Sequence, residues 1–244
     1  MVNFIVDPYA YQTFRVVYET TSVILCLILL RFMIKPYQIT KENRYLGLPL
    51  GFGFLGATYA LSAFVYFQPY FFGTGTIYLQ TVVRTFAFTF LCVTYYFSRK
   101  SAENNKWLWN ATLILLITVF VTSVILLSIP QVSLPSYQLT STITRVFNLT
   151  CIVYLCAHTL RSHIETPDPD TIWSPFGYIL LGISQYSLII YANDNSMSAW
   201  WGALAIRWAG LAIFLIIAYR AFYNTKTNAL ITPKKNGFNE RNHT

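Results

Sequence analysis

The sequence predicts an all-α, polytopic membrane protein with seven transmembrane helices, and three observations lead to this fold class. First, 55% of the 244 residues are hydrophobic and only 11% are charged, with a mean hydropathy of +0.47. A soluble domain could not cover its surface with so few charges. Second, seven apolar stretches have the length of about 20 residues that crosses a bilayer. Third, short polar segments separate them. The stretches lie at 9–31, 46–68, 77–98, 107–129, 137–161, 173–193 and 200–223.

The polar segments between the stretches have the composition of turns, which sets the end of each predicted helix. All are short, so we expect consecutive helices to be antiparallel neighbours in a single domain, 1–223. The tail, 224–244, is polar, and its composition is typical of a disordered, solvated segment; contact with anionic lipid is the alternative. In chain order the separating segments are KPYQITKENR, QPYFFGTGT, KSAENN, PQVSLP, HIETPDPD and NDNSMS.

The basic residues predict the orientation of the chain. Of the 17 lysines and arginines, thirteen fall in the first, third and fifth loops and the C-terminal segment, and the other side has none. Because cytoplasmic loops carry the excess of Lys and Arg, we expect the N-terminus outside and the C-terminus in the cytoplasm, in a multi-pass protein of the cell membrane. The net charge of +8 therefore belongs to loops beside membrane spans and does not indicate a nucleic-acid partner.

An internal repeat divides the seven stretches into two sets of three. Laid without gaps over Arg15–Arg31, the segment Arg145–Arg161 is identical at eight of seventeen positions. The following stretches also match, since PLGFGFLGAT from Pro49 shares its proline, two glycines and a leucine with PFGYILLGIS from Pro175. We therefore interpret about 9–98 and about 137–223 as parallel copies joined by a linker helix at 107–129.

This arrangement resembles the SWEET sugar transporters in architecture. Those proteins have a 3+1+3 order of seven helices, an outside N-terminus, and repeats related by an axis along the membrane normal. The resemblance covers all seven stretches and implies a transporter whose two repeats rock around a central site. The proline–glutamine loop signature of that superfamily is absent, so no functional residue is carried over.

Four of the predicted helices carry an arginine inside the apolar stretch. They are the odd-numbered stretches, which all run from outside to inside. At 1.5 Å per residue each arginine lies about 10–12 Å below the outer end, so the four share one layer. A charge at this depth costs at least about 2.5–3.5 kcal/mol and is a functional hypothesis by default. The residues are Arg15, Arg84, Arg145 and Arg207.

Polar side chains accompany these arginines at helical spacing. Glu19 lies one turn after Arg15, at a spacing suited to an ion pair, while Gln80 and Asn148 share the faces of their arginines. Because the planar guanidinium binds carboxylate, phosphate or sulfate bidentately, we predict a ligand-binding site for a small anion. Its residues are Arg15, Glu19, Gln80, Arg84, Arg145, Asn148 and Arg207. The alternative is that the arginines reach the headgroups, pair with Glu19 or Asp194, or bind helix carbonyls.

Three functions remain open at this stage. The first is a transporter that binds a small anion in an outward-facing cavity, and the second is a sensor or receptor that signals to a separate cytoplasmic protein. The third is a structural subunit of a larger membrane complex, with the arginines pairing acidic residues of a neighbour.

No nucleophile–base arrangement indicates an enzyme, and no cofactor is expected. His158 and His163 are five residues apart, on different helix faces, so no metal site is predicted.

Overall fold

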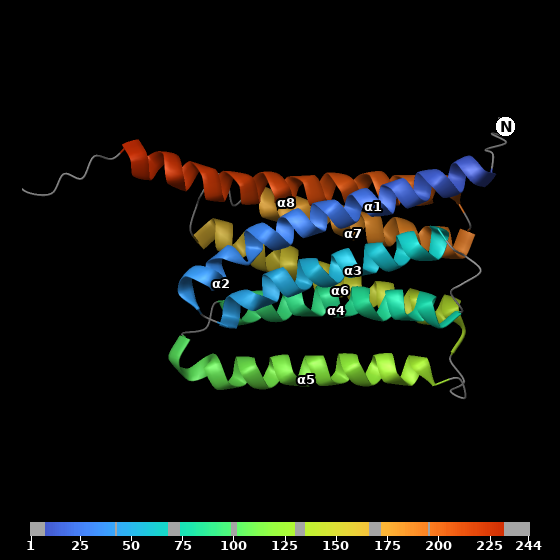
Figure 1. The fold of residues 1–244 in the computed structure, drawn as a ribbon, viewed down its shortest axis with the longest axis horizontal. Coiled ribbons are helices and arrows are strands. Elements are labelled where there is room, and N and C mark those ends of the chain that lie inside the picture. The colour runs from blue at the N-terminus through green and yellow to red at the C-terminus, as the bar shows by residue number, and fades with distance from the viewer. Residues whose placement is uncertain are drawn as a thin grey trace, which may run out of the picture.

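The computed structural model describes residues 8–41, 43–67, 74–98, 102–129, 135–165, 172–194 and 196–231. All regular structure in these residues is helical, and seven helices are long and apolar enough to cross a membrane (Figure 1). This confirms the prediction of an all-α chain with seven membrane-spanning helices, while the side that faces the cytoplasm stays a prediction. The seven are α1 (Pro8–Met33), α3 (Gly47–Phe67), α4 (Thr74–Ser98), α5 (Ala102–Ser128), α6 (Tyr137–Glu165), α7 (Trp173–Asp194) and α8 (Met197–Ile231).

Two segments differ from the prediction. The first loop, expected to be a turn, contains the short helix α2 (Lys35–Thr40) and the 3₁₀ helix η1 (Asn43–Leu46). Proline lies in the first turn of α2, where it is tolerated, and Lys41 ends the helix in the left-handed conformation with φ 55°. The other difference is α8, which continues past 223 to Ile231 because no glycine or proline follows until Pro233. The rest of the predicted tail lies outside the described residues.

Six of the spanning helices close a ring. α1 packs against α3, α3 against α4, α4 against α6, α6 against α7, α7 against α8, and α8 against α1. α5 lies outside this ring against α4 and η1 (Figure 1). In Figure 1, α1, α4, α6 and α8 run in one direction and α3, α5 and α7 in the other. The three-helix sets α1–α3–α4 and α6–α7–α8 therefore occupy opposite arcs of the ring.

Glycines allow close approach between α3 and α4 and between α7 and α8. A Cβ atom on Gly51 would lie 2.5 Å from Leu91, and one on Gly177 would lie 2.8 Å from Phe214. Such small residues let helix backbones approach in a membrane, where no hydrophobic effect drives helices together. The side chains of Leu91 and Phe214 consequently enter the centre of the ring and join its apolar core.

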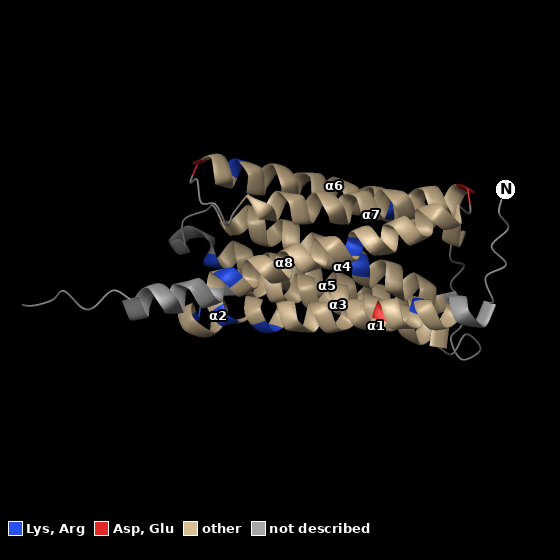
Figure 2. Ribbon diagram, turned by 90° about the horizontal axis from the view of Figure 1, so that it is seen from above, with Lys and Arg blue, Asp and Glu red and all other residues tan. Residues whose placement is uncertain are grey.

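Basic residues gather in two places along the bundle. Figure 2 shows Lys and Arg at the end where α2 lies, and a second group within the helices away from both ends. The first group is what the loop asymmetry of the sequence leads one to expect. The second group marks the position of the candidate site.

Candidate anion-binding site

All seven residues predicted to bind a ligand line one cavity, called here the arginine cavity. Its volume is about 60 Å³, and it lies between α1, α3, α4, α6, α7 and α8. One water needs about 10–15 Å³ by this measure, so the space suits a few waters or one small anion. The lining residues are Arg15, Glu19, Ser62, Tyr66, Gln80, Thr81, Arg84, Tyr137, Thr144, Arg145, Asn148, Leu188, Trp200, Leu204 and Arg207.

The two terminal nitrogens of Arg207 on α8 have hydrogen-bond partners on another helix, while its buried Nε has none among the described residues. Its two terminal nitrogens face the carboxylate of Glu19 on α1, with Nη2–Oε2 at 3.0 Å and Nη1–Oε1 at 3.4 Å. Nη2 also donates to the hydroxyl of Ser22 at 3.3 Å, and the guanidinium lies 4.3 Å from the ring centre of Tyr59. Both charged side chains are about 95% buried or more, so this is a desolvated, bidentate ion pair.

The spacing of Arg15 and Glu19 suits a local ion pair, but the carboxylate of Glu19 pairs with Arg207. Glu19 turns across the bundle to Arg207, and Arg15 instead lies over aromatic rings. The guanidinium carbon is 3.3 Å from the ring centre of Tyr66 and 4.9 Å from that of Trp200. Cation–π contacts of this kind are strengthened by desolvation. The pairing with Arg207 gives Glu19 two contacts from one guanidinium, an arrangement that a planar guanidinium and a carboxylate favour.

Arg84 and Arg145 line the arginine cavity from α4 and α6, and neither has an ion pair with a carboxylate among the described residues. Arg145 on α6 donates from Nη1 to the backbone carbonyl of Leu188 on α7, and it lies close enough to Arg84 on α4 for electrostatic repulsion. In the described part of the chain Arg84 makes no hydrogen bond, and its Nε is buried. Two half-buried guanidiniums of like charge therefore line the same cavity, where water screens their repulsion less than at the protein surface.

Asn148 adds an unsatisfied amide to the same place. The residue is 1% exposed, and neither its Nδ2 nor its Oδ1 has a hydrogen-bond partner among the described residues. A buried amide left without partners costs about 1–3 kcal/mol. Each such group in a native structure calls for an explanation, and a water molecule or a ligand in the adjoining cavity supplies one.

The lining of the cavity includes side chains beyond the seven predicted from the sequence. Ser62 and Tyr66 lie on α3, which contains no arginine, so no charge in its sequence indicates that it contributes to the site. Thr81 lies three residues before Arg84, and Leu204 lies three before Arg207, a spacing that places each on the face of its arginine. The same spacing rule would have found these two. Of the residues weighed as partners, Asp194 is exposed at the end of α7 and does not line the cavity.

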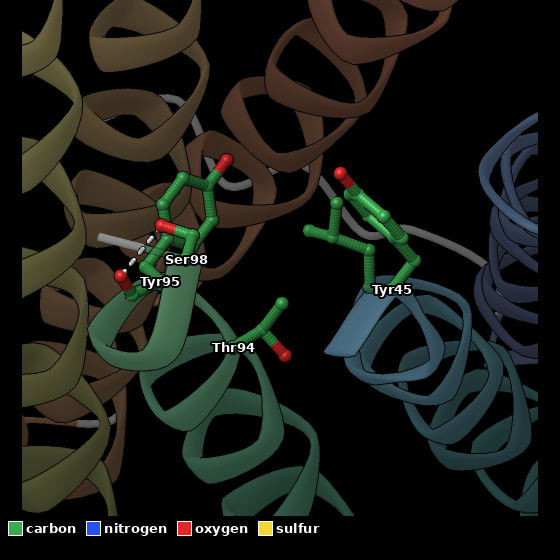
Figure 3. Close-up of a pocket in the computed structure, with 5 residues that line it drawn as sticks. Tyr45, Thr94, Tyr95 and Ser98 are labelled. Carbon is green, nitrogen blue, oxygen red and sulfur yellow. Dashed lines mark hydrogen bonds between the residues drawn. The ribbon is translucent and has the colours of Figure 1, made fainter. Parts of the chain in front are cut away.

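A second cavity, called here the tyrosine cavity, lies toward the α2 end of the bundle. It has a volume of about 210 Å³ and is lined by Tyr45, Leu48, Thr94, Tyr95 and Ser98 (Figure 3). Figure 3 shows these side chains entering the space from η1 and the start of α3 on one side and from the end of α4 on the other. None of them is charged, so this cavity is chemically unlike the arginine cavity.

An aromatic layer lies between the two cavities. Phe214 packs on Phe52 at 5.6 Å and on Tyr178 at 4.7 Å between ring centres. The hydroxyl of Tyr178 donates to that of Tyr95, which lines the tyrosine cavity, at 3.1 Å. Above the layer, Tyr59 contacts Arg207 of the arginine cavity. The order along α3 places this layer between the two cavities, since Phe52 lies between Leu48 of the tyrosine cavity and Tyr59, which contacts Arg207.

The chemistry available in the arginine cavity is the binding of negative charge. Its lining includes four guanidiniums and one carboxylate, and that carboxylate is taken up by Arg207. Among the described residues no group of three His, Cys, Asp or Glu side chains could hold a metal ion. The remaining guanidinium and amide groups are hydrogen-bond donors that suit an oxyanion.

Comparison with known proteins adds no family to this description. No protein-family model, no curated protein and no solved structure matches the chain. The fold and the arrangement of side chains in the arginine cavity are therefore the basis of any functional assignment.

Proposed function

We propose that this integral membrane protein binds a small anionic solute in the arginine cavity and transports it across the membrane. One observation carries the proposal: four arginines surround a cavity of about 60 Å³ whose single carboxylate is already paired with Arg207. Buried charge without compensation is costly, and intramembrane arginines mark ion and substrate pathways in membrane proteins. An anion in the cavity would compensate the charge of the remaining arginines.

The arrangement of the helices supports transport over simple binding. The arginine cavity and the tyrosine cavity lie on either side of the aromatic layer of Phe52, Tyr178 and Phe214. Alternating access requires a site between two arcs of helices and a closed layer on one side of it. Movement of α1–α3–α4 against α6–α7–α8 would open this layer, as the architectural resemblance to SWEET transporters implies.

The test is flux into liposomes that contain the purified full-length protein. Uptake of radiolabelled sulfate, phosphate, acetate and chloride is measured for the wild type, Arg145→Gln and Arg161→Gln. Arg161 is the matched control, because it is exposed and bound to Glu165 one turn away at 2.8 Å. We expect uptake of at least one anion, loss of that uptake in Arg145→Gln, and wild-type uptake in Arg161→Gln. Uptake that is absent for every anion rejects the transport function.

A sensor or receptor is the second candidate, and the length of α8 favours it. This helix has 35 residues and spans about 52 Å at 1.5 Å per residue, against about 30 Å of hydrocarbon. A helix that crosses the membrane and continues could carry a change of packing from the arginine cavity to a separate protein. Binding of an anion without flux, together with a stoichiometric partner that co-purifies, would favour this role.

A further inference from the structure

The contacts between helices place two arginines in equivalent settings on opposite arcs of the ring. Arg207 lies seven residues before Phe214, which faces Gly177, and Arg84 lies seven residues before Leu91, which faces Gly51. Seven residues are about two helical turns, so each arginine lies two turns from the same kind of glycine contact. Arg207 on α8 has α1 beside it, and Arg84 on α4 has α6 beside it.

The same register relates α1 to α6. Gly56 on α3 faces Cys26 on α1, and Gly182 on α7 faces Ile152 on α6. Counting back seven residues from Cys26 gives Glu19, and counting back seven from Ile152 gives Arg145. Counting back four gives Ser22 and Asn148. The partners that hold Arg207, a carboxylate and a hydroxyl, therefore correspond to an arginine and an amide beside Arg84.

This difference leaves the second setting without a negative acceptor. Beside Arg207, the oxygens of Glu19 and Ser22 accept its hydrogen bonds. Beside Arg84, Arg145 repels it and the amide of Asn148 has no partner among the described residues. A group with negative charge and several oxygens would complete the second setting as Glu19 completes the first.

We propose that an oxyanion group binds between Arg84 and Arg145, with the Asn148 amide as a third donor. The inference rests on the proposed function and specifies its ligand: a carboxylate, sulfate or phosphate group, not a halide. An oxyanion offers several acceptor lone pairs, in directions that match the fork of a guanidinium group. Donors from three separate side chains can therefore bind one oxyanion at the same time. The cavity of about 60 Å³ admits one such group, and Arg207 with Glu19 stays an internal ion pair.

The experiment measures binding of inorganic sulfate to the purified full-length protein in detergent by calorimetry, with chloride and a short-chain phosphatidate as the other ligands. Four proteins are compared: wild type, Arg84→Gln, Arg145→Glu and Arg161→Gln. Sulfate affinity should fall by about 10- to 100-fold in Arg84→Gln, because this is the fold-change that the loss of a hydrogen bond to a charged group produces. Arg145→Glu should abolish sulfate binding and raise the melting temperature of the sulfate-free protein, because it rebuilds the ion pair of the first setting. Arg161→Gln should bind sulfate like the wild type.

The other outcomes separate this inference from the proposed function. Sulfate affinity unchanged in Arg84→Gln and Arg145→Glu overturns the position of the site and leaves anion binding in place. Chloride binding as tight as sulfate binding overturns the oxyanion class. Phosphatidate binding without sulfate binding supports the oxyanion position but makes its source a lipid headgroup, which overturns a solute function. Absence of binding by all three ligands overturns both proposals.

Discussion

Arg207, which is buried, and Arg84, which is half-buried, occupy matching positions with different surroundings. Arg207 has a carboxylate at 3.0 Å, a hydroxyl at 3.3 Å and an aromatic ring at 4.3 Å. Arg84 has another arginine and an amide that makes no hydrogen bond among the described residues. The residue type alone therefore does not tell whether an intramembrane arginine is structural or functional. The acceptors that neighbouring helices place around it decide between the two roles.

The largest expected effect comes from Glu19→Gln, which breaks the internal ion pair. Removing one partner leaves the charge of Arg207 buried, so the free energy of unfolding should fall by about 3–5 kcal/mol. Thermal unfolding of the purified protein in detergent measures the loss. The double variant Glu19→Gln with Arg207→Gln should recover much of it. A double variant as unstable as the single one would show that the pair is not the source of the loss.

The glycine contacts that define the register give the next effect. Gly51→Ala should lower the free energy of unfolding by about 1–3 kcal/mol, because its Cβ would lie 2.5 Å from Leu91. Gly177→Ala should act in the same direction against Phe214. Gly202 is the control, since a Cβ there meets nothing within 4 Å and Gly202→Ala should cause no loss. Equal stability of all three variants would remove the basis for comparing the two arcs.

Arg84→Gln should have the opposite sign to Glu19→Gln. In the absence of any anion it removes a half-buried charge that has no carboxylate partner, so the free energy of unfolding should rise by about 1–2 kcal/mol. The same thermal measurement is made in a buffer whose only anion is too large for the cavity. A loss of stability would place Arg84 with Arg207 among the structural arginines.

The smallest expected effect concerns the aromatic layer. Tyr178 corresponds to Phe52 in the paired segments that begin at Pro49 and Pro175, and Tyr178→Phe makes the two arcs alike there. The change removes the hydrogen bond to Tyr95 and should lower the free energy of unfolding by about 0.6 kcal/mol, the average for such bonds in membrane proteins. If the layer closes the transport path, the variant should also raise uptake in liposomes. Unchanged stability and uptake would assign the layer to packing alone.

The sequence predicted the helices well because membrane spans leave a direct signal in composition and length. Each of the seven predicted stretches corresponds to one spanning helix. The residues of the arginine cavity were also predictable, since a charge in an apolar stretch is conspicuous and helices that run the same way place equal depths together. All seven predicted residues line one cavity, although their role in binding stays a prediction.

The pairing of these residues could not be predicted from the sequence. Alignment by identity matches Arg15 with Arg145, whereas the glycine contacts match Glu19 with Arg145, one turn further along. Residues four apart share a face of a helix, so a helix can shift by one turn and still bury the same face. Sequence identity therefore does not determine the depth at which each arginine meets its neighbours. The internal repeat itself stays a prediction.

The position of α5 has a consequence for how this architecture can change over time. Among the described residues α5 packs on α4 and η1 and reaches α3 through Phe120, and none of its most apolar window is buried within the bundle. Its contribution is one additional membrane crossing. This crossing returns the chain to the side of the membrane where α1 begins, so α6 can run in the same direction as α1. Trp109 and Phe120 anchor it through contacts with Phe97, Phe54 and Phe86. Outside these contacts, almost any apolar sequence long enough to cross the membrane would provide the same crossing. The sequence of α5 should therefore change faster between related proteins than the sequences of the other helices.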